Sequence, residues 1–216
     1  MAHYPIYLDL TDRPCVVVGG CGLAAEKAKG LLAAGARVTV VAPELTPELA
    51  DLAVEGRIDV LARRFRRGDL RKAFLVVVAE RDRSIVEAVW NESRERNVLV
   101  NTVDDVPHCD FIAPAVLRRG DLAVAISTHG KAPALAVRLR QRLEAELGKE
   151  HAQFLELAGA VRAPLAKLLP DLGARRDLWY RLIDSDILQL LRQGDEDAAA
   201  DRFEEILGVR PESGAA

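Results

Sequence analysis

The sequence predicts a doubly wound α/β domain, in which helices cover both faces of a parallel sheet. Three observations predict it: short Val-rich runs, helical patterns between these runs, and a glycine cluster directly after the first of them. Apolar β-branched runs bounded by glycine or proline are typical of strands buried on both faces of a parallel sheet. Because strands and helices alternate at this spacing, right-handed crossovers are expected to join them.

Length and composition agree with a packed protein that works in a reducing compartment. Half of the 216 residues are apolar, and the net charge of −3 argues against a nucleic-acid binder. No run of about 18 apolar residues predicts a membrane span, and the N-terminus does not resemble a signal peptide. The cysteines Cys15, Cys21 and Cys109 follow no metal-ligand spacing. We therefore expect free thiols, no metal site and a cytoplasmic location.

The first half of the chain carries the alternating elements. Residues 4–10 alternate in polarity and are predicted to form a strand that leads into a turn at residues 12–13. The remaining predicted strands are residues 16–18, 37–42, 58–61, 74–79 and 98–102. The predicted helices are residues 24–34, 47–55 and 82–96, and Gly35 and Gly56 are expected to end the first two.

After residue 104 the pattern changes. Strands are predicted at 111–115 and 122–127 around a turn at 118–121, and a helix is predicted over 133–147. Residues 149–207 are predicted to be helical, with breaks near Pro164, at 170–173 and near Gly194.

These patterns divide the chain into four parts. They are a nucleotide-binding domain (1–112), a small α+β region (113–148), a helical domain (149–207) and a disordered tail (208–216). The middle part is too small for a core of its own. We therefore expect two chains to share it in a homodimer, which makes 113–148 the predicted dimerisation region.

The turn Gly19-Gly20-Cys21-Gly22 joins the first buried strand to a helix. Glycines let the backbone approach a ligand, and a helix N-terminus offers N–H groups and a positive dipole to a phosphate. The turn therefore predicts a dinucleotide pyrophosphate site. The fingerprint fits in two ways, since Cys21 takes the second glycine position if it starts at Gly19, whereas Gly20, Gly22 and Ala25 match if it starts one residue later. A tight turn without a ligand is the alternative.

The end of the second strand supplies the next candidate. An acidic residue here normally holds the ribose hydroxyls of a dinucleotide. Pro43 and Glu44 follow this strand, and no Arg or Lys stands beside them to receive a 2′-phosphate. NAD is therefore favoured over NADP. The alternative is that Glu44 only caps the following helix.

Polar side chains also follow the fifth strand. Asn101, Asp104 and Asp105 come where the carboxyl end of this strand is expected, and ligands of open parallel sheets bind beyond such ends. We expect these three residues to meet whatever lies against the cofactor. Two adjacent acids in a solvated turn are the alternative.

A further polar turn lies between the strand at 122–127 and the helix at 133–147. It contains Ser127, Thr128, His129 and Lys131. Hydroxyls, bare N–H groups and a cation suit an anionic ligand. The alternative is an ordinary helix cap by Ser127 or Thr128.

Together these stretches resemble the precorrin-2 dehydrogenase/sirohydrochlorin ferrochelatase family. The resemblance covers nearly the whole chain and is carried by YPIYLDLTDRPCVVVGG, VTVVAPE, VNTVDD, CDFIAPA and RRGDLAVAISTHGKAPALA. It implies a homodimer built from a Rossmann-like NAD-binding domain, a dimerisation region and a small helical domain. It also implies NAD-dependent oxidation of precorrin-2 to sirohydrochlorin, followed by chelation of Fe²⁺ to give sirohaem.

The resemblance also implies residue roles. The acid that acts as general base in the family falls on Asp104, and the family's serine before the long helix falls on Thr128. The NAD contacts fall on Gly22 and Leu23 and on residues 43–44. In the same cofactor site Gly19, Gly20 and Cys21 line the turn, while residues 101, 105, 127–129 and 131 are assigned to the substrate.

Three departures from the family pattern leave other functions open. Cys21 replaces the third glycine of the loop, His129 replaces a glycine, and Glu26-Lys27 replaces an Arg-Lys pair. The alternatives are a dehydrogenase without chelatase activity and a non-catalytic protein that binds a tetrapyrrole. Because the sequence ends at Ala216, methylation of the uroporphyrinogen precursor is expected from another protein.

Overall fold

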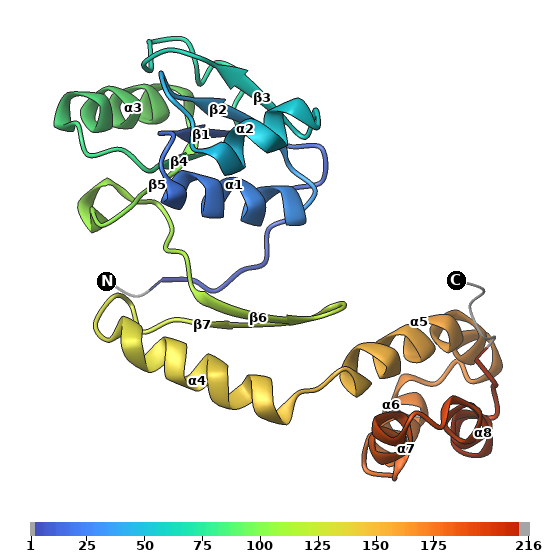
Figure 1. The fold of residues 1–216 in the computed structure, drawn as a ribbon. Coiled ribbons are helices and arrows are strands. Elements are labelled where there is room, and N and C mark those ends of the chain that lie inside the picture. The colour runs from blue at the N-terminus through green and yellow to red at the C-terminus, as the bar shows by residue number, and fades with distance from the viewer. Residues whose placement is uncertain (1–2, 212–216) are drawn as a thin grey trace. The chain divides into compact units, whose positions relative to one another are not determined.

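The computed structural model describes residues 3–211, which divide between Ala113 and Pro114 into two compact units. The first unit is built on a five-stranded sheet in the order β3-β2-β1-β4-β5, and every neighbouring pair is parallel. Its elements, shown in Figure 1, are β1 (Pro14–Val18), α1 (Gly22–Ala33), β2 (Arg37–Val41), α2 (Pro47–Val54), β3 (Ile58–Leu61), β4 (Leu75–Val78), α3 (Arg83–Arg96), β5 (Leu99–Thr102) and the 3₁₀ turn η1 (Val106–His108). The predicted doubly wound sheet is confirmed.

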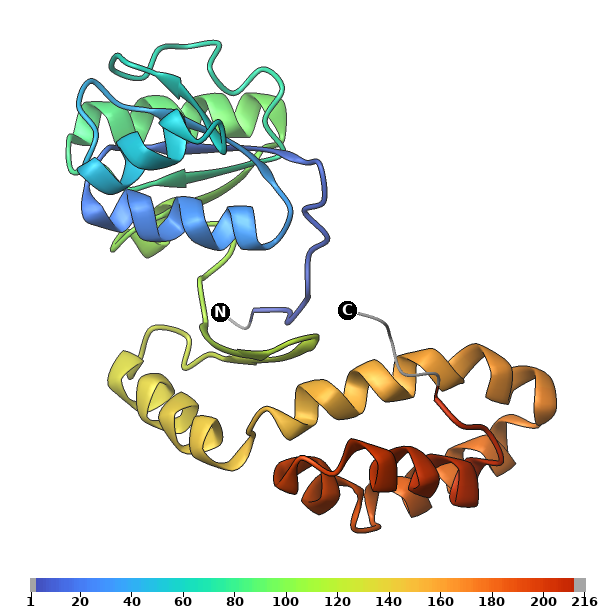
Figure 2. The same ribbon diagram turned by 45° about the vertical axis from the view of Figure 1, so that its right-hand side comes forward.

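Helices cover both faces of this sheet, as Figures 1 and 2 show. Alternate residues of a strand point to opposite faces, so β1 contributes to two cores. Cys15 and Val17 are buried against α1 and α2, whereas Val16 and Val18 are buried against α3. The carboxyl ends of the strands are left uncovered by helices, which is where a ligand of this fold binds.

The predicted strand at residues 4–10 is wrong. These residues have no strand pairing in the described part of the chain, and Tyr4, Ile6 and Tyr7 are exposed. Only Leu10, at the end of the segment, is buried in the core of the first unit. The alternation of apolar and polar side chains was a poor guide here because a strand also needs a neighbouring backbone for its hydrogen bonds.

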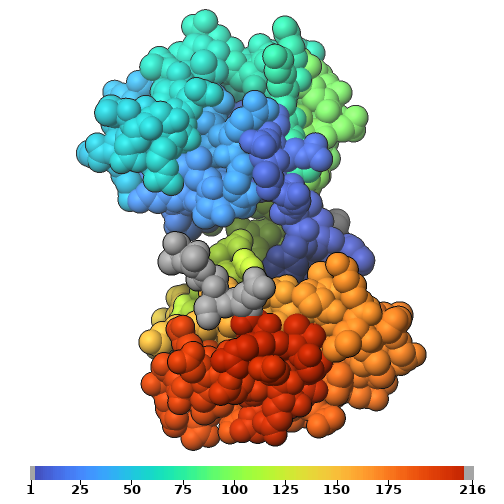
Figure 3. Space-filling view, turned by 90° about the vertical axis from the view of Figure 1, so that its right-hand side faces the viewer, coloured from blue at the N-terminus to red at the C-terminus, as the bar shows by residue number. Residues whose placement is uncertain are grey.

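The second unit combines a β-hairpin with helices. Strands β6 (Ala115–Arg119) and β7 (Leu122–Ile126) are antiparallel and joined at Gly120, whose φ of 54° favours glycine. The helices are α4 (Pro133–Glu146), α5 (Glu150–Leu168), α6 (Leu172–Ile183), α7 (Ile187–Gln193) and α8 (Glu196–Leu207). On the face shown in Figure 3, the orange and red segments pack directly against each other. Side chains of α5 to α8 share a buried cluster around Phe203.

Two details of the second unit differ from prediction. The first hairpin strand begins at Ala115 and not at residue 111, because Phe111 packs into the first unit's core and its carbonyl accepts the Asn101 amide. Pro164 lies inside α5 and does not break it, since the flanking Val161 and Leu165 are buried.

The break predicted at 170–173 lies at 169–171, since α6 already begins at Leu172. The break near Gly194 is confirmed, and Gly194 has a φ of 82°. A further break at Ser185 was not predicted. Its hydroxyl donates to the Leu182 carbonyl and accepts from the Ile187 N–H, which ends one helix and starts the next. Residues 212–216 of the predicted disordered tail lie outside the described residues.

Candidate functional site

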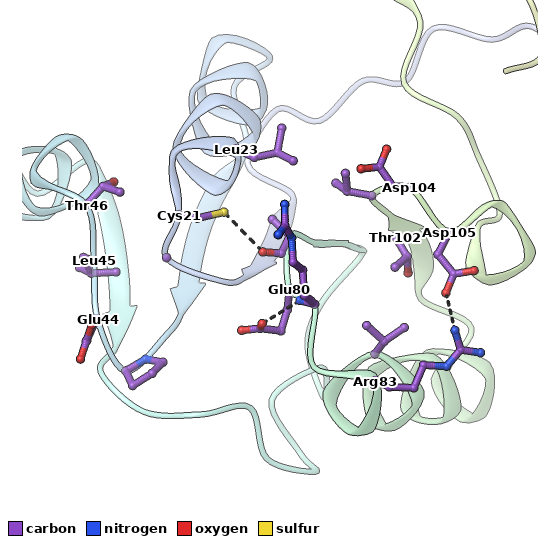
Figure 4. A pocket seen from close by; sticks show the side chains of 16 residues that line it. Cys21, Leu23, Glu44, Leu45, Thr46, Glu80, Arg83, Thr102, Asp104 and Asp105 are labelled. Atoms are coloured by element: carbon purple, nitrogen blue, oxygen red, sulfur yellow. Dashed lines mark hydrogen bonds and ion pairs between the residues drawn. The ribbon is translucent and has the colours of Figure 1, made fainter. Parts of the chain in front are cut away.

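A cavity of about 750 Å³ opens at the carboxyl ends of the parallel strands, entirely within the first unit (Figure 4). This volume lies within the range of small-molecule and cofactor sites. Its walls come from the segments that follow β1, β2, β4 and β5. The residues that line it are Gly20, Cys21, Leu23, Pro43, Glu44, Leu45, Thr46, Ala79, Glu80, Arg81, Arg83, Val86, Thr102, Val103, Asp104 and Asp105.

Two features of the backbone shape the glycine turn: the conformation of Gly19 and the close approach of Gly20 to another segment. Gly19 has a φ of 123°, a conformation that L side chains rarely adopt. A Cβ on Gly20 would come within 1.8 Å of the Glu44 carbonyl oxygen. Gly20 also accepts a hydrogen bond from the Thr46 N–H at 3.0 Å, which ties the turn to the start of α2. These two glycines are therefore required by the fold itself.

The two residues that follow are placed differently. Cys21 is the N-cap of α1, makes no side-chain cap, and donates through Sγ to the Ala79 carbonyl at 3.6 Å. The thiol thus reaches toward the end of β4, as Figure 4 shows. Gly22 begins the helix, and a Cβ there would meet nothing within 4 Å. The N–H groups of this first helical turn have no partner within the helix and lie at its positive end.

The residues present fit a dinucleotide. Besides the helix N-terminus, the cavity wall holds two threonines, Thr46 and Thr102, whose Oγ1 atoms are buried and have no hydrogen-bond partner among the described residues. Figure 4 shows them on opposite sides of the cavity. A buried hydroxyl without a partner costs about 1–3 kcal/mol. A ligand with polar groups at both ends would relieve that cost.

The segment after β4 also contributes to the wall, which the sequence reasoning missed. Glu80, Arg81 and Arg83 lie on this segment and line the cavity. The two threonines, which line the cavity from other segments, were also missed. The available signal was that β4 is a parallel strand and ends at the same edge as β1 and β5. A second hollow of about 90 Å³ adjoins the cavity at Pro43 and Glu80 and includes Arg64, which pairs with Asp82 at 3.4 Å.

The loop after β5 brings Asp104 to the cavity. Asp104 is exposed, has a φ of 59°, and its carboxylate has no hydrogen bond or ion pair with the described residues. A left-handed conformation is uncommon for a residue other than glycine, and such residues cluster at functional sites. The carboxylate is therefore free to act on a bound molecule.

The neighbouring Asp105 is engaged. Its Oδ2 atom lies 2.8 Å from His108 Nδ1 and 3.5 Å from an Arg83 guanidinium nitrogen, and its side chain is only 20 % exposed. Asn101 is buried, donates to the Phe111 carbonyl at 2.8 Å, and is not among the cavity residues. The two flanking candidates therefore stabilise the loop around Asp104, and a substrate contact by either stays a prediction.

Cys109 closes the same loop. Its thiol contacts the Thr102 carbonyl at 3.2 Å and the Asp105 carbonyl at 3.3 Å. Burial raises the pKa of this thiol, and the charges of Asp105 and Asp110 raise it further, although the Thr102 N–H acts in the opposite direction. Cys109 is thus a neutral packing residue at neutral pH.

The polar turn of residues 127–131 lies in the second unit. Ser127 Oγ accepts from the His129 N–H at 3.1 Å, and Thr128 Oγ1 accepts from the Ala132 N–H at 3.2 Å. His129 has a φ of 55° and Lys131 follows it. The hydroxyls order the turn before α4, and binding of an anion by this turn stays a prediction.

Residues 3–211 contain neither a cluster of metal ligands nor a membrane-spanning helix. No group of three or more His, Cys, Asp and Glu side chains there is arranged to hold a metal ion. Within the same range, every helix is too short or too polar to cross a membrane.

Three family models match the chain in sequence. The first, described as "Putative NAD(P)-binding", matches residues 6–115. The second, "Sirohaem biosynthesis protein central", matches 119–146, and the third, "Sirohaem synthase dimerisation region", matches 150–207. The dimerisation model therefore covers the helical part of the chain, whereas the sequence reasoning placed the dimerisation region at 113–148.

Curated relatives resemble the chain over most of its length. "Siroheme synthase 1" of Aeromonas salmonicida is 42% identical over 92% of this chain and 43% of the relative. "Siroheme synthase 1" of Serratia proteamaculans is 39% identical over 96% of this chain and 44% of the relative. The chain thus spans less than half the length of these relatives. Among solved structures, "SirC, precorrin-2 dehydrogenase" superposes with a TM-score of 0.77 at 28% identity, covering 94% of this chain and all of that one.

Proposed function

The chain belongs to the precorrin-2 dehydrogenase/sirohydrochlorin ferrochelatase family, and from this membership we propose that it oxidises precorrin-2 to sirohydrochlorin with NAD⁺. One observation carries the proposal: a single cavity joins a glycine turn at a helix N-terminus to the carboxylate of Asp104, which has no partner within residues 3–211. The relatives support an oxidoreductase with an NAD(P)-binding domain. The substrate, the cofactor form and the roles of individual residues belong to the proposal.

The two sides of the cavity receive different parts of the cofactor. The N–H groups at Gly22 and Leu23 are donors for the pyrophosphate at the start of α1. Pro43 and Glu44 follow β2 and are proposed to hold the adenosine ribose. The Glu44 carboxylate accepts hydrogen bonds from ribose hydroxyls but repels a 2′-phosphate, which favours NAD over NADP.

The chemistry of the oxidation divides into a hydride and a proton. Bound NAD⁺ supplies the hydride acceptor. When a C–H bond of precorrin-2 breaks and its electron pair leaves with the hydride, a proton must also leave the macrocycle. We assign its acceptance to Asp104, whose carboxylate is exposed to the cavity and has no competing partner among the described residues.

Chelation is a second candidate activity. When Fe²⁺ enters sirohydrochlorin as a substrate, two pyrrole protons leave, and a free carboxylate is a suitable base for them. The same unpaired Asp104 therefore supports this step. Two alternatives are open. The first is a dehydrogenase that leaves metal insertion to another enzyme, and the second is a tetrapyrrole carrier without catalytic activity.

The remaining predicted contacts complete the proposal. Asn101, Asp105, Ser127, Thr128, His129 and Lys131 are assigned to the substrate. The cationic side chain of Lys131 suits the carboxylates of a tetrapyrrole. A homodimer is proposed because a dimerisation region is among the matched families. The three free cysteines support a reducing compartment, and we place the reaction in the cytoplasm.

The test is an anaerobic assay of precorrin-2 with NAD⁺, followed by absorbance of sirohydrochlorin and NADH. The Asp104→Asn variant keeps the shape of the side chain but loses the base, so we expect kcat to fall at least about 100-fold with little change in NAD⁺ affinity. Asp51→Asn, an exposed acid on α2 outside the cavity, is the matched control. Equal kcat in wild type and Asp104→Asn would exclude Asp104 as the base.

The same assay separates the alternatives. Fe²⁺ added to sirohydrochlorin without NAD⁺ tests chelation alone, and the sirohaem spectrum should appear faster than in the absence of protein. Tetrapyrrole binding without any NADH would instead favour the carrier.

A further inference from the structure

The loop that presents Asp104 holds this residue in the left-handed region, within a turn closed by the Asp105 N–H donating to the Thr102 carbonyl at 3.3 Å. Asp104 has a φ of 59°, and its own side chain makes no bond to the described residues that would hold it there. A left-handed residue other than glycine persists only where its surroundings determine it. The contacts that do so must therefore come from the residues on either side.

The strongest of these contacts is on the next residue. Asp105 Oδ2 lies 2.8 Å from His108 Nδ1 and 3.5 Å from the Arg83 guanidinium, and the Arg83 contact is drawn in Figure 4. An ionised carboxylate only accepts hydrogen bonds, so the Nδ1 atom of His108 carries the proton of this contact. Asp105 is thereby held by its own loop, through His108, and by α3, through Arg83.

His108 is in turn fixed against α3. Its ring meets the edge of Trp90 at a centroid distance of 5.1 Å and an interplanar angle of 87°. The Arg94 guanidinium covers Trp90 at 4.3 Å and pairs with Asp110. Asp110 accepts from the Val100 N–H at 3.0 Å, so the far end of the loop is tied back to β5.

We propose that His108 is a positioning residue for the oxidation: through Asp105, it holds the loop in the conformation that presents Asp104 to the substrate. This inference rests on the proposed role of Asp104. The set formed by Arg83, Trp90, Asp105 and His108 is called the loop clamp below. In this proposal Asp105 orients its neighbour Asp104, and the contact with the substrate that is proposed for Asp105 lies away from the reacting atoms.

Two substitutions of His108 separate the hydrogen bond from the ring. His108→Asn keeps a donor near the position of Nδ1 but loses the ring, whereas His108→Phe keeps a ring against Trp90 but loses the donor. A displacement of about 1 Å at a catalytic group can cost a hundredfold in rate. We therefore expect His108→Phe to lower kcat about tenfold or more without changing the Kd for NAD⁺, and His108→Asn to restore most of the rate.

The matched control is Glu95→Gln, a charge change on the same helix whose partner is Arg67, outside the loop clamp. It should leave kcat unchanged. A purely structural role of His108 would change thermal stability in both variants without this split between kcat and Kd.

A double-mutant cycle with Asp104→Asn makes the test decisive. If His108 acts through Asp104, His108→Phe has no further effect on kcat in the Asp104→Asn background. An equal loss in both backgrounds, or an unchanged kcat in His108→Phe alone, would overturn the proposal while leaving the role of Asp104 intact. An unchanged kcat in Asp104→Asn would instead exclude Asp104 as the base, and the positioning role of His108 would then fail for that reason.

Hydrogen exchange of the free protein gives a readout that is independent of activity. The amides of Asp105 and Cys109, which are hydrogen-bonded within the loop, should exchange faster in His108→Phe than in wild type or His108→Asn, because the loop opens more often when Asp105 is released. Equal exchange in all three proteins would contradict the clamp.

Discussion

Individual residues around the cavity show which features serve the fold and which are left for a ligand. Gly19 and Gly20 are required by backbone conformation and close approach, so their presence alone does not indicate a cofactor. Thr102 is different, since it lies at the carboxyl end of β5, is 4% exposed, and has a hydroxyl without a partner among the described residues. Its backbone N–H and carbonyl are both occupied by Cys109. The side chain is therefore the unsatisfied part.

Thr102→Val should change stability and affinity in opposite directions. Val has nearly the same shape but no buried hydroxyl, so we expect the free energy of unfolding of the free protein to rise by about 1 kcal/mol. If the ligand supplies a partner to the hydroxyl, the Kd for NAD⁺ should rise about five- to tenfold. Urea unfolding and calorimetric titration measure the two effects, and Thr102→Ser, which keeps the hydroxyl, is the control. Lower stability together with unchanged affinity would show that this hydroxyl serves only the fold.

At the scale of elements, buried charge links helices that are distant in sequence. Glu150 begins α5 with a side chain only 4% exposed, and its Oε1 atom accepts from Arg192 of α7 at 2.5 and 3.1 Å. A Cβ on Gly148, two residues before α5, would come within 2.3 Å of the same carboxylate, so a side chain there would displace Glu150 from its position. The start of α5 thus depends on the last turn of α7.

This pair predicts the response of the helical unit to acid. Burial by itself raises the pKa of Glu150, but the hydrogen bonds and charge of Arg192, with smaller help from the backbone and His151, hold that pKa below its usual range. A lowered pKa means that the stabilisation is present at neutral pH and is lost as the pH falls below about 4.

Arg192→Met should lower the free energy of unfolding at pH 7 by about 2 kcal/mol, because it leaves a buried carboxylate unpaired. The difference from wild type should then shrink as the pH falls, since protonation of Glu150 becomes favourable in the variant. Urea unfolding followed by circular dichroism between pH 7 and pH 4 measures this, with the exposed pair of Arg176 and Asp177 as a control through Arg176→Met. A difference that grows on acidification would contradict the assignment.

For the whole molecule, the sequence was most informative where structure is local. The strand at residues 58–61 was predicted to the residue, and the side of the sheet that carries Glu44 and Asp104 followed from the parallel topology. Residues 4–10 were misread because strand formation depends on a partner. The sequence reasoning did not foresee that Asn101, which alternates with Thr102 along β5, donates its amide to the Phe111 carbonyl, and its substrate contact stays a prediction. The loop clamp depends on contacts across 25 residues of sequence, from Arg83 to His108, which no local pattern contains.

The division into two units leads to the last prediction. Every residue that lines the cavity precedes Ala113, and both buried clusters of the parallel sheet are formed by residues before that point. A chain that ends at Ala113 should therefore fold and bind NAD⁺ with a Kd within about threefold of the full chain, a difference below 1 kcal/mol. It should not oxidise precorrin-2 at a measurable rate, because the turn that carries Thr128 and Lys131 is proposed to hold the substrate. Calorimetry measures the binding of NAD⁺, and the anaerobic assay measures the oxidation of precorrin-2. The comparison is the full chain with Thr128→Ala and Lys131→Ala. This variant is expected to lose substrate affinity but to keep the Kd for NAD⁺. Full activity of the shortened chain would show that the first unit alone holds both molecules, and would remove the second unit from the proposed substrate site.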